Sequence, residues 1–324
     1  TTNHVDEKVY QTGVTAYSKV ESDSSDAVIT YSDNTTGYAK SANNSDVKLY
    51  NHGESDKYRD FNSLNTSSGK ENQYALDDAG KAVLAYTEEN SNSTAKTEAD
   101  YQAGKNALDN SRNTVVKNTN TKTSADKTVA ITDETTTDIL VYQEGHELKG
   151  TTTEVSAGQE KLTKADGTGY TYTTSGKVEN KDYSSRMGLL ASGDVKQSIK
   201  TEETETLAQT GKSTVSITRG NEAVARTDSS FTDAHYGSET VTAADGSTTT
   251  VAKKVVTEAD KLAIVDSTTQ TRTETKVAAD KSSTSNTATR VDSVNGIVVS
   301  ATKTQTDAAG KATTTESKTT IDAN

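Results

Sequence analysis

Polar and apolar residues alternate along much of the second half of the chain, and threonine occupies many of the alternate positions. A period of two places successive side chains on opposite sides of a strand, and Thr and Val both favour strands. The alternation is clearest in 248–251, 269–277 and 313–321. These stretches predict β-strands.

Short turn segments separate the alternating stretches. They combine Asp or Gly with Ala or Lys, and Asp and Gly tolerate the positive φ that tight hairpins need. The segments are 78–81, 125–127, 165–167, 244–246, 259–261, 279–281 and 309–311. Their spacing is irregular, so the sequence predicts a string of β-hairpins and not a strict solenoid.

The first third of the chain has a different composition. Nine of the 14 tyrosines fall between Tyr10 and Tyr101, among many Asn and Ser residues. Residues 10–19 and 31–40 resemble each other, and each predicts two short strands around a turn. Three segments follow from these shifts in composition: a Tyr/Asn/Ser-rich β region (1–112), a Thr-rich β region (113–200) and a repetitive Thr/Val/Lys hairpin shaft (201–324).

Four alanines between residues 93 and 110 recur at every fourth position. This spacing places them on one side of a helix. We therefore expect a short helical linker at the end of the first segment. The alanines are Ala95, Ala99, Ala103 and Ala107.

The composition excludes a thick hydrophobic core. Apolar residues make up 30% of the 324 residues, with two Phe, one Met and no Trp. Burial contributes about 25 cal/mol per Å² against about 1–2 kcal/mol of backbone entropy per residue, so a monomer of this composition lacks stabilising area. Disordered chains are usually rich in proline; this one has none, and its 14 tyrosines and Thr/Val alternation favour order. We expect the missing burial to come from partner copies, most simply three intertwined chains sharing a thin prism of Val, Ile, Ala and Thr methyl groups.

Charge and cysteine content limit the partners and the kinds of site that the chain can have. The net charge of −12 argues against a nucleic-acid partner, and the absence of Cys excludes disulfides and thiolate metal sites. The longest apolar run, 82–86, is far shorter than the roughly 20 residues that cross a bilayer, so direct membrane insertion is not expected. The chain begins at Thr1 without a leader, and we interpret it as a piece of a longer protein.

The hairpin string, including segments 294–299 and 319–324, resembles the β-prism and stalk regions of trimeric autotransporter adhesins. It is also similar in style to phage tail-fibre shafts. Both resemblances imply a homotrimeric surface fibre rich in Thr, Ser, Asn and Gly. Phrases such as 242–248 also resemble the outer domains of flagellins, which implies a subunit of a polymerising filament as a further alternative.

Candidate chemistry is sparse. His4, His52, His146 and His235 lack the spacing of metal ligands, and no nucleophile elbow or nucleotide-binding fingerprint occurs. The acidic clusters 21–26 and 77–78 and the segment 219–221 are interpreted as turns. We therefore expect no catalytic residue, no metal and no cofactor.

Exposed tyrosines on a polar sheet are the best candidates for ligand binding, because aromatic rings stack on sugars and anchor partner surfaces. The alternative is that they fill an interface between chains. The candidates are Tyr10, Tyr17, Tyr31, Tyr38, Tyr50 and Tyr58.

Together these features predict an all-β, elongated fibrous architecture of β-hairpins, expected to be a homotrimer. The predicted role is a structural and adhesive segment of an extracellular bacterial surface fibre that projects a binding tip. Expected partners are further copies of the chain and a host-surface glycan or protein. The alternatives are a phage tail-fibre shaft, placed on a virion tail, and a pilin-like or flagellin-like filament subunit.

Overall fold

The computed structural model describes residues 8–10, 14–30, 36–55, 58–103, 107–144, 147–185 and 191–323. Side chains are described for 68–70, 72–75, 77–81, 83–96, 113–137, 150, 152–183 and 191–323. Every helix or strand in the described ranges is a β-strand, which confirms the all-β prediction. The chain divides into two units, residues 1–145 with 152–173, and residues 146–151 with 174–324.

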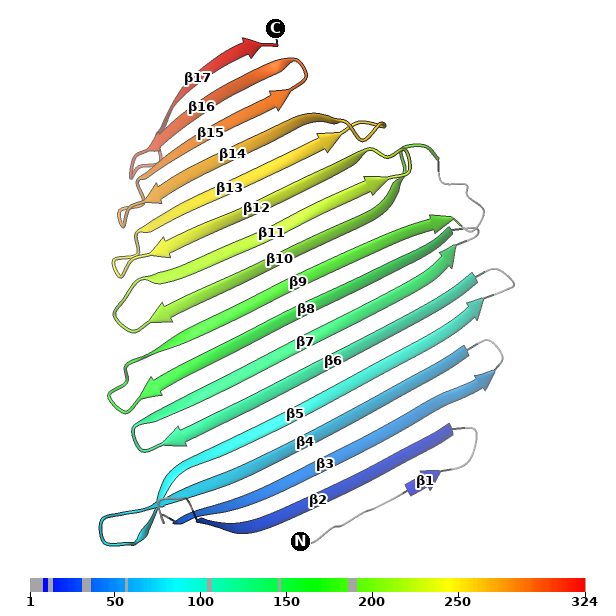
Figure 1. Cartoon of the computed structure of the whole chain (residues 1–324), viewed down its shortest axis with the longest axis vertical. Helices are drawn as coiled ribbons and strands as arrows, with labels where there is room; N and C mark the ends of the chain where they lie inside the picture. The colour runs from blue at the N-terminus through cyan, green and yellow to red at the C-terminus, as the bar shows by residue number, and fades with distance from the viewer. Residues whose placement is uncertain are drawn as a thin grey trace. The chain divides into compact units, whose positions relative to one another are not determined.

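The strands of the first unit follow one another as an antiparallel meander. Each strand from β1 to β6 pairs with the next one in the chain, and Figure 1 shows β1 to β7 side by side in chain order. β8 and β9 contribute residues to both units. The strands are β1 (Lys8–Tyr10), β2 (Val14–Thr30), β3 (Thr36–Ser55), β4 (Tyr58–Leu76), β5 (Ala82–Ala103), β6 (Ala107–Ser124), β7 (Lys127–Glu144), β8 (Glu147–Lys164) and β9 (Gly169–Ser185).

The second unit repeats this arrangement. Consecutive strands from β10 to β17 are again antiparallel neighbours, so the predicted string of hairpins is confirmed. The strands are β10 (Val195–Gln209), β11 (Thr214–Arg226), β12 (Phe231–Thr242), β13 (Thr248–Ala259), β14 (Val265–Val277), β15 (Ser283–Ser293), β16 (Gly296–Thr306) and β17 (Ala312–Asp322).

The strands are longer than the sequence suggested. β2 and β3 have 17 and 20 residues, so the prediction of short strands in 10–19 and 31–40 was wrong in length. Each long strand is paired along nearly its whole length, because an antiparallel neighbour satisfies its N–H and C=O groups. Ladder hydrogen bonds therefore hold these strands together along their length.

All seven predicted turn segments lie at connections between consecutive strands. Seven loops among the described residues share one geometry. In the β12–β13 loop, the amide of Ala243 donates to the carbonyl of Ser247 (2.8 Å), and the amide of Gly246 donates to the carbonyl of Ala243 (3.0 Å). The loops with this pair of bonds begin at Asp77, Lys164, Arg226, Ala243, Asp260, Ala278 and Asp307.

The fourth residue of each of these loops has a positive φ. It is glycine in four loops and Ser229, Ala263 or Lys281 in the others, with φ of 72°, 58° and 69°. This is a three-residue hairpin loop ending in a left-handed residue. The β11–β12 loop was not among the predicted turns, although it shares a signal with the loops that begin at Lys164, Ala243 and Ala278: an Asp followed two residues later by a hydroxyl residue.

The helical linker predicted in 93–110 is wrong. Ala95, Ala99 and Ala103 belong to β5, and Ala107 begins β6. A spacing of four residues is also a multiple of two, so it fits one side of a strand as well as one side of a helix. The pairing of β5 with both β4 and β6 decides between the two.

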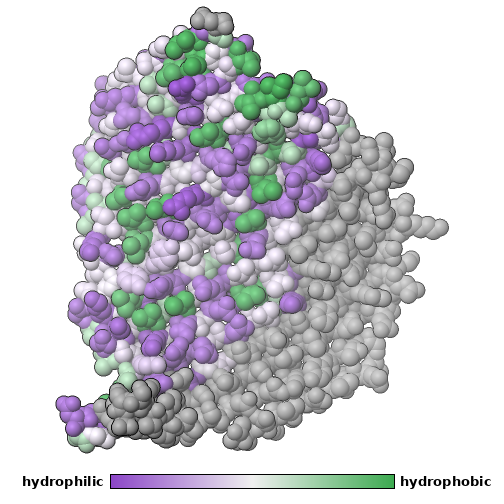
Figure 2. Space-filling model, viewed as in Figure 1, coloured by the Kyte–Doolittle hydropathy of each residue, from purple (hydrophilic) through white to green (hydrophobic). Residues whose placement is uncertain are grey.

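Burial is minimal. Among residues with described side chains, only Ala234 (8% exposed) and Ala259 (7%) are buried. Figure 2 shows one face of the molecule, and over its coloured part the hydrophobic residues lie in small separate groups among hydrophilic ones. The prism arrangement, the trimer and the three-segment division stay predictions.

Candidate binding surfaces

The candidate tyrosines are placed by register only. Tyr31 lies outside the described residues, and so do the side chains of the other five. In the ladders, Tyr10 and Tyr50 lie opposite Ala16 on its two sides. Tyr17 is opposite Leu49. Tyr38 and Tyr58 are each opposite a tyrosine outside the set, Tyr74 and Tyr101. The pairing of tyrosines across neighbouring strands is thus present, but no two of the five candidates placed in the ladders lie directly opposite each other.

The histidines are not brought together. His4 and His146 lie outside the described residues, and His52 is a backbone position in β3. The exposed ring of His235 has its Nε2 3.1 Å from Oδ2 of Asp233, two residues away on the same strand. Within the described residues there is no group of three His, Cys, Asp or Glu side chains able to hold a metal ion. In the same part of the chain, no helix has the length and apolarity needed to cross a membrane.

Two turn predictions for polar segments were wrong. Residues 21–26 lie inside β2 and residues 219–221 inside β11, whereas 77–78 are in a turn as predicted. Gly220 has a packing role in its strand. A Cβ at this position would lie 2.5 Å from Cζ of Tyr236 and 2.6 Å from the carbonyl oxygen of Thr201. The glycine therefore makes room for the tyrosine ring on the neighbouring strand.

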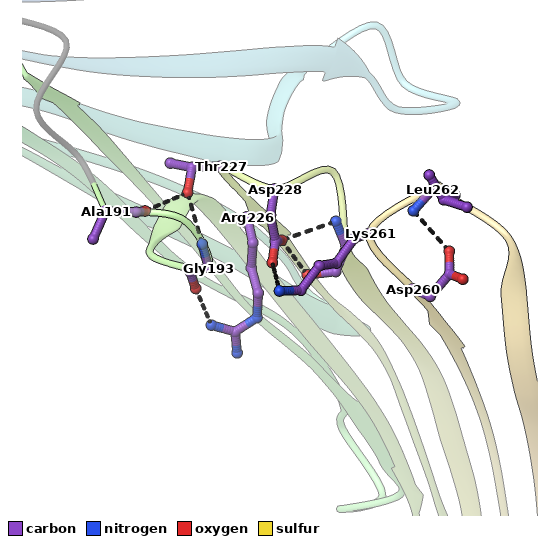
Figure 3. Close-up of polar contacts among 9 residues, drawn as sticks. Ala191, Gly193, Arg226, Thr227, Asp228, Asp260, Lys261 and Leu262 are labelled. Carbon is purple, nitrogen blue, oxygen red and sulfur yellow. Dashed lines mark hydrogen bonds and ion pairs between the residues drawn. The ribbon is translucent and has the colours of Figure 1, made fainter.

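A polar network fixes one corner of the second unit, where loop 191–194 meets the β11–β12 turn (Figure 3). The Thr227 hydroxyl donates to the carbonyl of Ala191 (2.6 Å) and accepts from the amide of Gly193 (3.0 Å). Nη1 of Arg226 donates to the carbonyl of Gly193 (3.1 Å). These bonds satisfy loop groups that no ladder pairs, so the corner has a defined backbone.

The neighbouring β13–β14 turn presents apolar side chains from an ordered backbone. Oδ1 of Asp260 accepts from the amide of Leu262 (2.8 Å), and Nζ of Lys261 lies 3.9 Å from Oδ2 of Asp228 (Figure 3). The same Oδ1 also accepts from the amide of Ile264 (3.0 Å). The turns that begin at Asp77 and Asp307 have the same bonds but carry Ala and Lys at the corresponding positions. Leu262 is 76% exposed and Ile264 55% exposed. This apolar tip is a sequence-specific feature that turn prediction alone does not reveal.

The turn carboxylates are stabilised in their charged form. The hydroxyl of Ser230 holds the pKa of Asp228 below its ordinary value, and Thr168 does the same for Asp166. Ser247 lowers the pKa of Asp245, and Ser282 that of Asp280. In each case the hydroxyl donates to the carboxylate from two residues further along.

Strands β14–β16 have two chemically different faces. Residues directly opposite each other in a ladder lie on the same side of the sheet, and neighbours along a strand lie on opposite sides. On one side, which we call the hydroxyl face, every residue is Ser, Thr, Val or Gly. These residues are Ser267, Thr269, Thr271, Thr273, Thr275, Val277, Ser283, Ser285, Thr287, Thr289, Val291, Ser293, Gly296, Val298, Ser300, Thr302, Thr304 and Thr306.

Every charged residue in these paired segments lies on the opposite side, which we call the charged face. They are Arg272, Glu274, Lys276, Arg290, Asp292 and Lys303. On the hydroxyl face, cross-strand hydroxyls bond to each other, as in Thr273–Thr287 (3.1 Å) and Thr275–Ser285 (3.0 Å). Since these hydroxyls already have partners, covering the face with another surface leaves few polar groups unsatisfied.

The charged face carries a groove of about 340 Å³ across β13–β16. One wall is the row Lys253, Arg272 and Ala288, and the other is the row Val255, Gln270, Arg290 and Val299. The residues between the two rows, Lys254, Thr271 and Thr289, line the floor through their backbone, because the register directs their side chains to the other face. No acidic residue lines the groove.

Two acidic residues lie just outside the groove and pair with its arginines. Oε2 of Glu274 is 3.3 Å from Nη2 of Arg272, and both oxygens of Asp292 are 2.9 Å from Nε of Arg290. Lys276, and after it Arg272, lowers the pKa of Glu274, and Asp292 raises the pKa of Arg290. Lys253 has no ion pair with any residue that the structure describes.

Comparison of the chain with protein-family models, with curated proteins and with solved structures finds no match.

Proposed function

We propose that this chain is a structural and adhesive segment of an extracellular bacterial surface fibre, assembled from several copies. The observation that carries the proposal is the hydroxyl face of β14–β16, an uncharged surface with paired hydroxyls that no layer of the second unit's described residues buries. Such a surface is suited to packing against a second surface of its own kind. The charged face remains in solvent and is available for contacts with host or neighbouring cells.

The size of the hydroxyl face favours an assembly of repeated contacts. Strands of 11 residues rise about 3.4 Å per residue and lie about 4.8 Å apart, so three strands cover roughly 500 Å². A standard protein interface covers about 800 Å² on each partner. One such contact is therefore weak, and stability grows when many copies align along a fibre. Only Ala234 and Ala259 are buried among the described side chains. Contacts with other copies would therefore supply buried area that the chain lacks on its own.

Two adjacent valines provide a matched test. Val298 lies on the hydroxyl face, whereas Val299 lies on the charged face. Val298→Asp places a charge in the proposed contact, whereas Val299→Asp makes the same chemical change on the solvent side. We expect Val298→Asp to reduce assembly strongly and Val299→Asp to leave it nearly unchanged.

The measurement is molar mass and hydrodynamic radius of the purified chain by light scattering. A mass of two or more times 34.3 kDa with an extended shape supports the proposal. A monomeric mass at all concentrations contradicts it, and so does equal loss of assembly in both valine variants. Antibody labelling of intact cells then tests the extracellular location, since an internal protein stays unlabelled.

A further inference from the structure

The groove on the charged face concentrates positive charge in an acidic chain. Lys253 and Arg272 lie directly opposite each other in the β13–β14 ladder. Like charges directly opposite each other destabilise a sheet. Arg290 lies on the facing wall of the same groove. Three cations thus surround one shallow groove, although the whole chain has a net charge of −12.

The local acidic residues neutralise this charge only in part. Glu274 is shared between Arg272 and Lys276, and Lys253 has no acidic partner in the described part of the chain. A guanidinium has five N–H donors, and the contacts of Arg290 with Asp292 use only some of them. Donors therefore remain for an anion lying in the groove.

We propose that this groove binds an acidic polysaccharide through Lys253, Arg272 and Arg290. This inference rests on the proposed adhesive function and names the ligand class for it. Charge complementarity selects an anionic ligand. The exposed methyl groups of Val255, Val299 and Ala288 are suited to contact the apolar faces of sugar rings.

The backbone of the groove favours a polysaccharide over an acidic peptide. The floor residues Lys254, Thr271 and Thr289 take part in the β13–β14–β15 ladders. An extended peptide gains affinity by pairing its main chain with a free strand edge, and the groove floor offers no such edge. The groove runs across four strands, about 14 Å at about 4.8 Å per strand, which accommodates a short run of sugar rings. Recognition then depends on side-chain cations meeting carboxylate or sulfate groups.

The neighbouring lysines of β13 provide a matched control. Lys253 lines a wall of the groove, and Lys254 directs its side chain to the other face. Lys253→Gln and Lys254→Gln change the net charge equally, so a long-range charge effect alters both alike. Arg272→Gln removes the opposite cation of the same wall.

The test measures binding of the full chain to immobilised dextran sulfate and polygalacturonate, with neutral dextran and poly-glutamate as comparisons. We expect binding to both acidic polysaccharides, weakened by added salt. Lys253→Gln combined with Arg272→Gln should weaken it about tenfold, equivalent to the loss of about one charge-assisted hydrogen bond. Lys254→Gln should change it less than about twofold.

Several results would overturn the inference. These are no binding to either acidic polysaccharide, equal losses in the Lys253 and Lys254 variants, or equally tight binding of poly-glutamate. Light scattering on the same samples separates this inference from the proposed fibre. An assembled chain that ignores acidic polysaccharides contradicts only the groove, and a monomeric chain that binds them through Lys253 contradicts only the assembly.

Discussion

Ala263 provides the sharpest test of how the hairpin loops specify this fold. It has a φ of 58° at the position that is Gly80, Gly167, Gly246 or Gly310 in related loops. The left-handed conformation costs an L-residue about 1–2 kcal/mol. Glycine removes that strain but adds about 0.5–1 kcal/mol of unfolded-chain entropy. Ala263→Gly should therefore stabilise the β13–β14 hairpin by about 0.5–1 kcal/mol.

The reverse change is available in a loop of the same geometry. A Cβ added at Gly310 meets no atom within 4 Å, so Gly310→Ala introduces backbone strain without a steric clash. We expect it to destabilise the β16–β17 hairpin by about 1 kcal/mol. Ala308→Gly, in the same loop but not at a positive φ, controls for chain entropy and should also destabilise.

Hydrogen exchange is the suitable assay, because a meander with little core opens locally and a global unfolding energy is poorly defined. A change of 0.5–1 kcal/mol alters exchange of the hairpin amides by about twofold to fivefold. The amides of β13 and β14 should exchange more slowly in Ala263→Gly. Faster exchange there, of the size seen with Ala308→Gly, would refute the reasoning from backbone strain.

Two further predictions concern packing and acidity. Gly220→Ala should destabilise the β10–β12 region by about 1–3 kcal/mol, because its Cβ would overlap the Tyr236 ring. Hydrogen exchange of the β11 amides measures this change. Gly237→Ala is the control, since a Cβ there would lie 3.3 Å from its nearest atom, and an equal effect of the two variants would contradict the prediction. Acidification should loosen the hairpins. Folding lowers the pKa values of Asp166, Asp228, Asp245 and Asp280. The stability that these carboxylates add to the folded hairpins is therefore present above the unfolded pKa of about 3.9 and is lost as the pH falls through the folded pKa values. An NMR titration of the carboxyls should also show Thr168→Val raising the pKa of Asp166 but not that of Asp280, and equal shifts in both would argue against the hydroxyl as the cause.

Much of the fold is local and can be predicted from the sequence. Alternation in 269–277 and the turn segment at 279–281 indicate strand and turn without reference to the rest of the chain, since period-two patterning and loop chemistry act between near neighbours. The same local reasoning failed where one pattern fits two structures. The four-residue spacing of Ala95 and Ala99 fits a helix or a strand, and only pairing with β4 and β6 decides for the strand.

The candidate surfaces depend on register, which the sequence does not specify. Lys253 and Arg272 are separated by 18 intervening residues, and the loop geometry that closes β13–β14 places them opposite each other. A shift of one residue would move Arg272 to the hydroxyl face and remove the groove. The sequence by itself determined that this protein is a thinly packed β-hairpin chain, because composition limits burial and alternation sets the strands. Only the tertiary structure decided which side chains share a face, because that depends on cross-strand hydrogen bonds between residues distant in the chain.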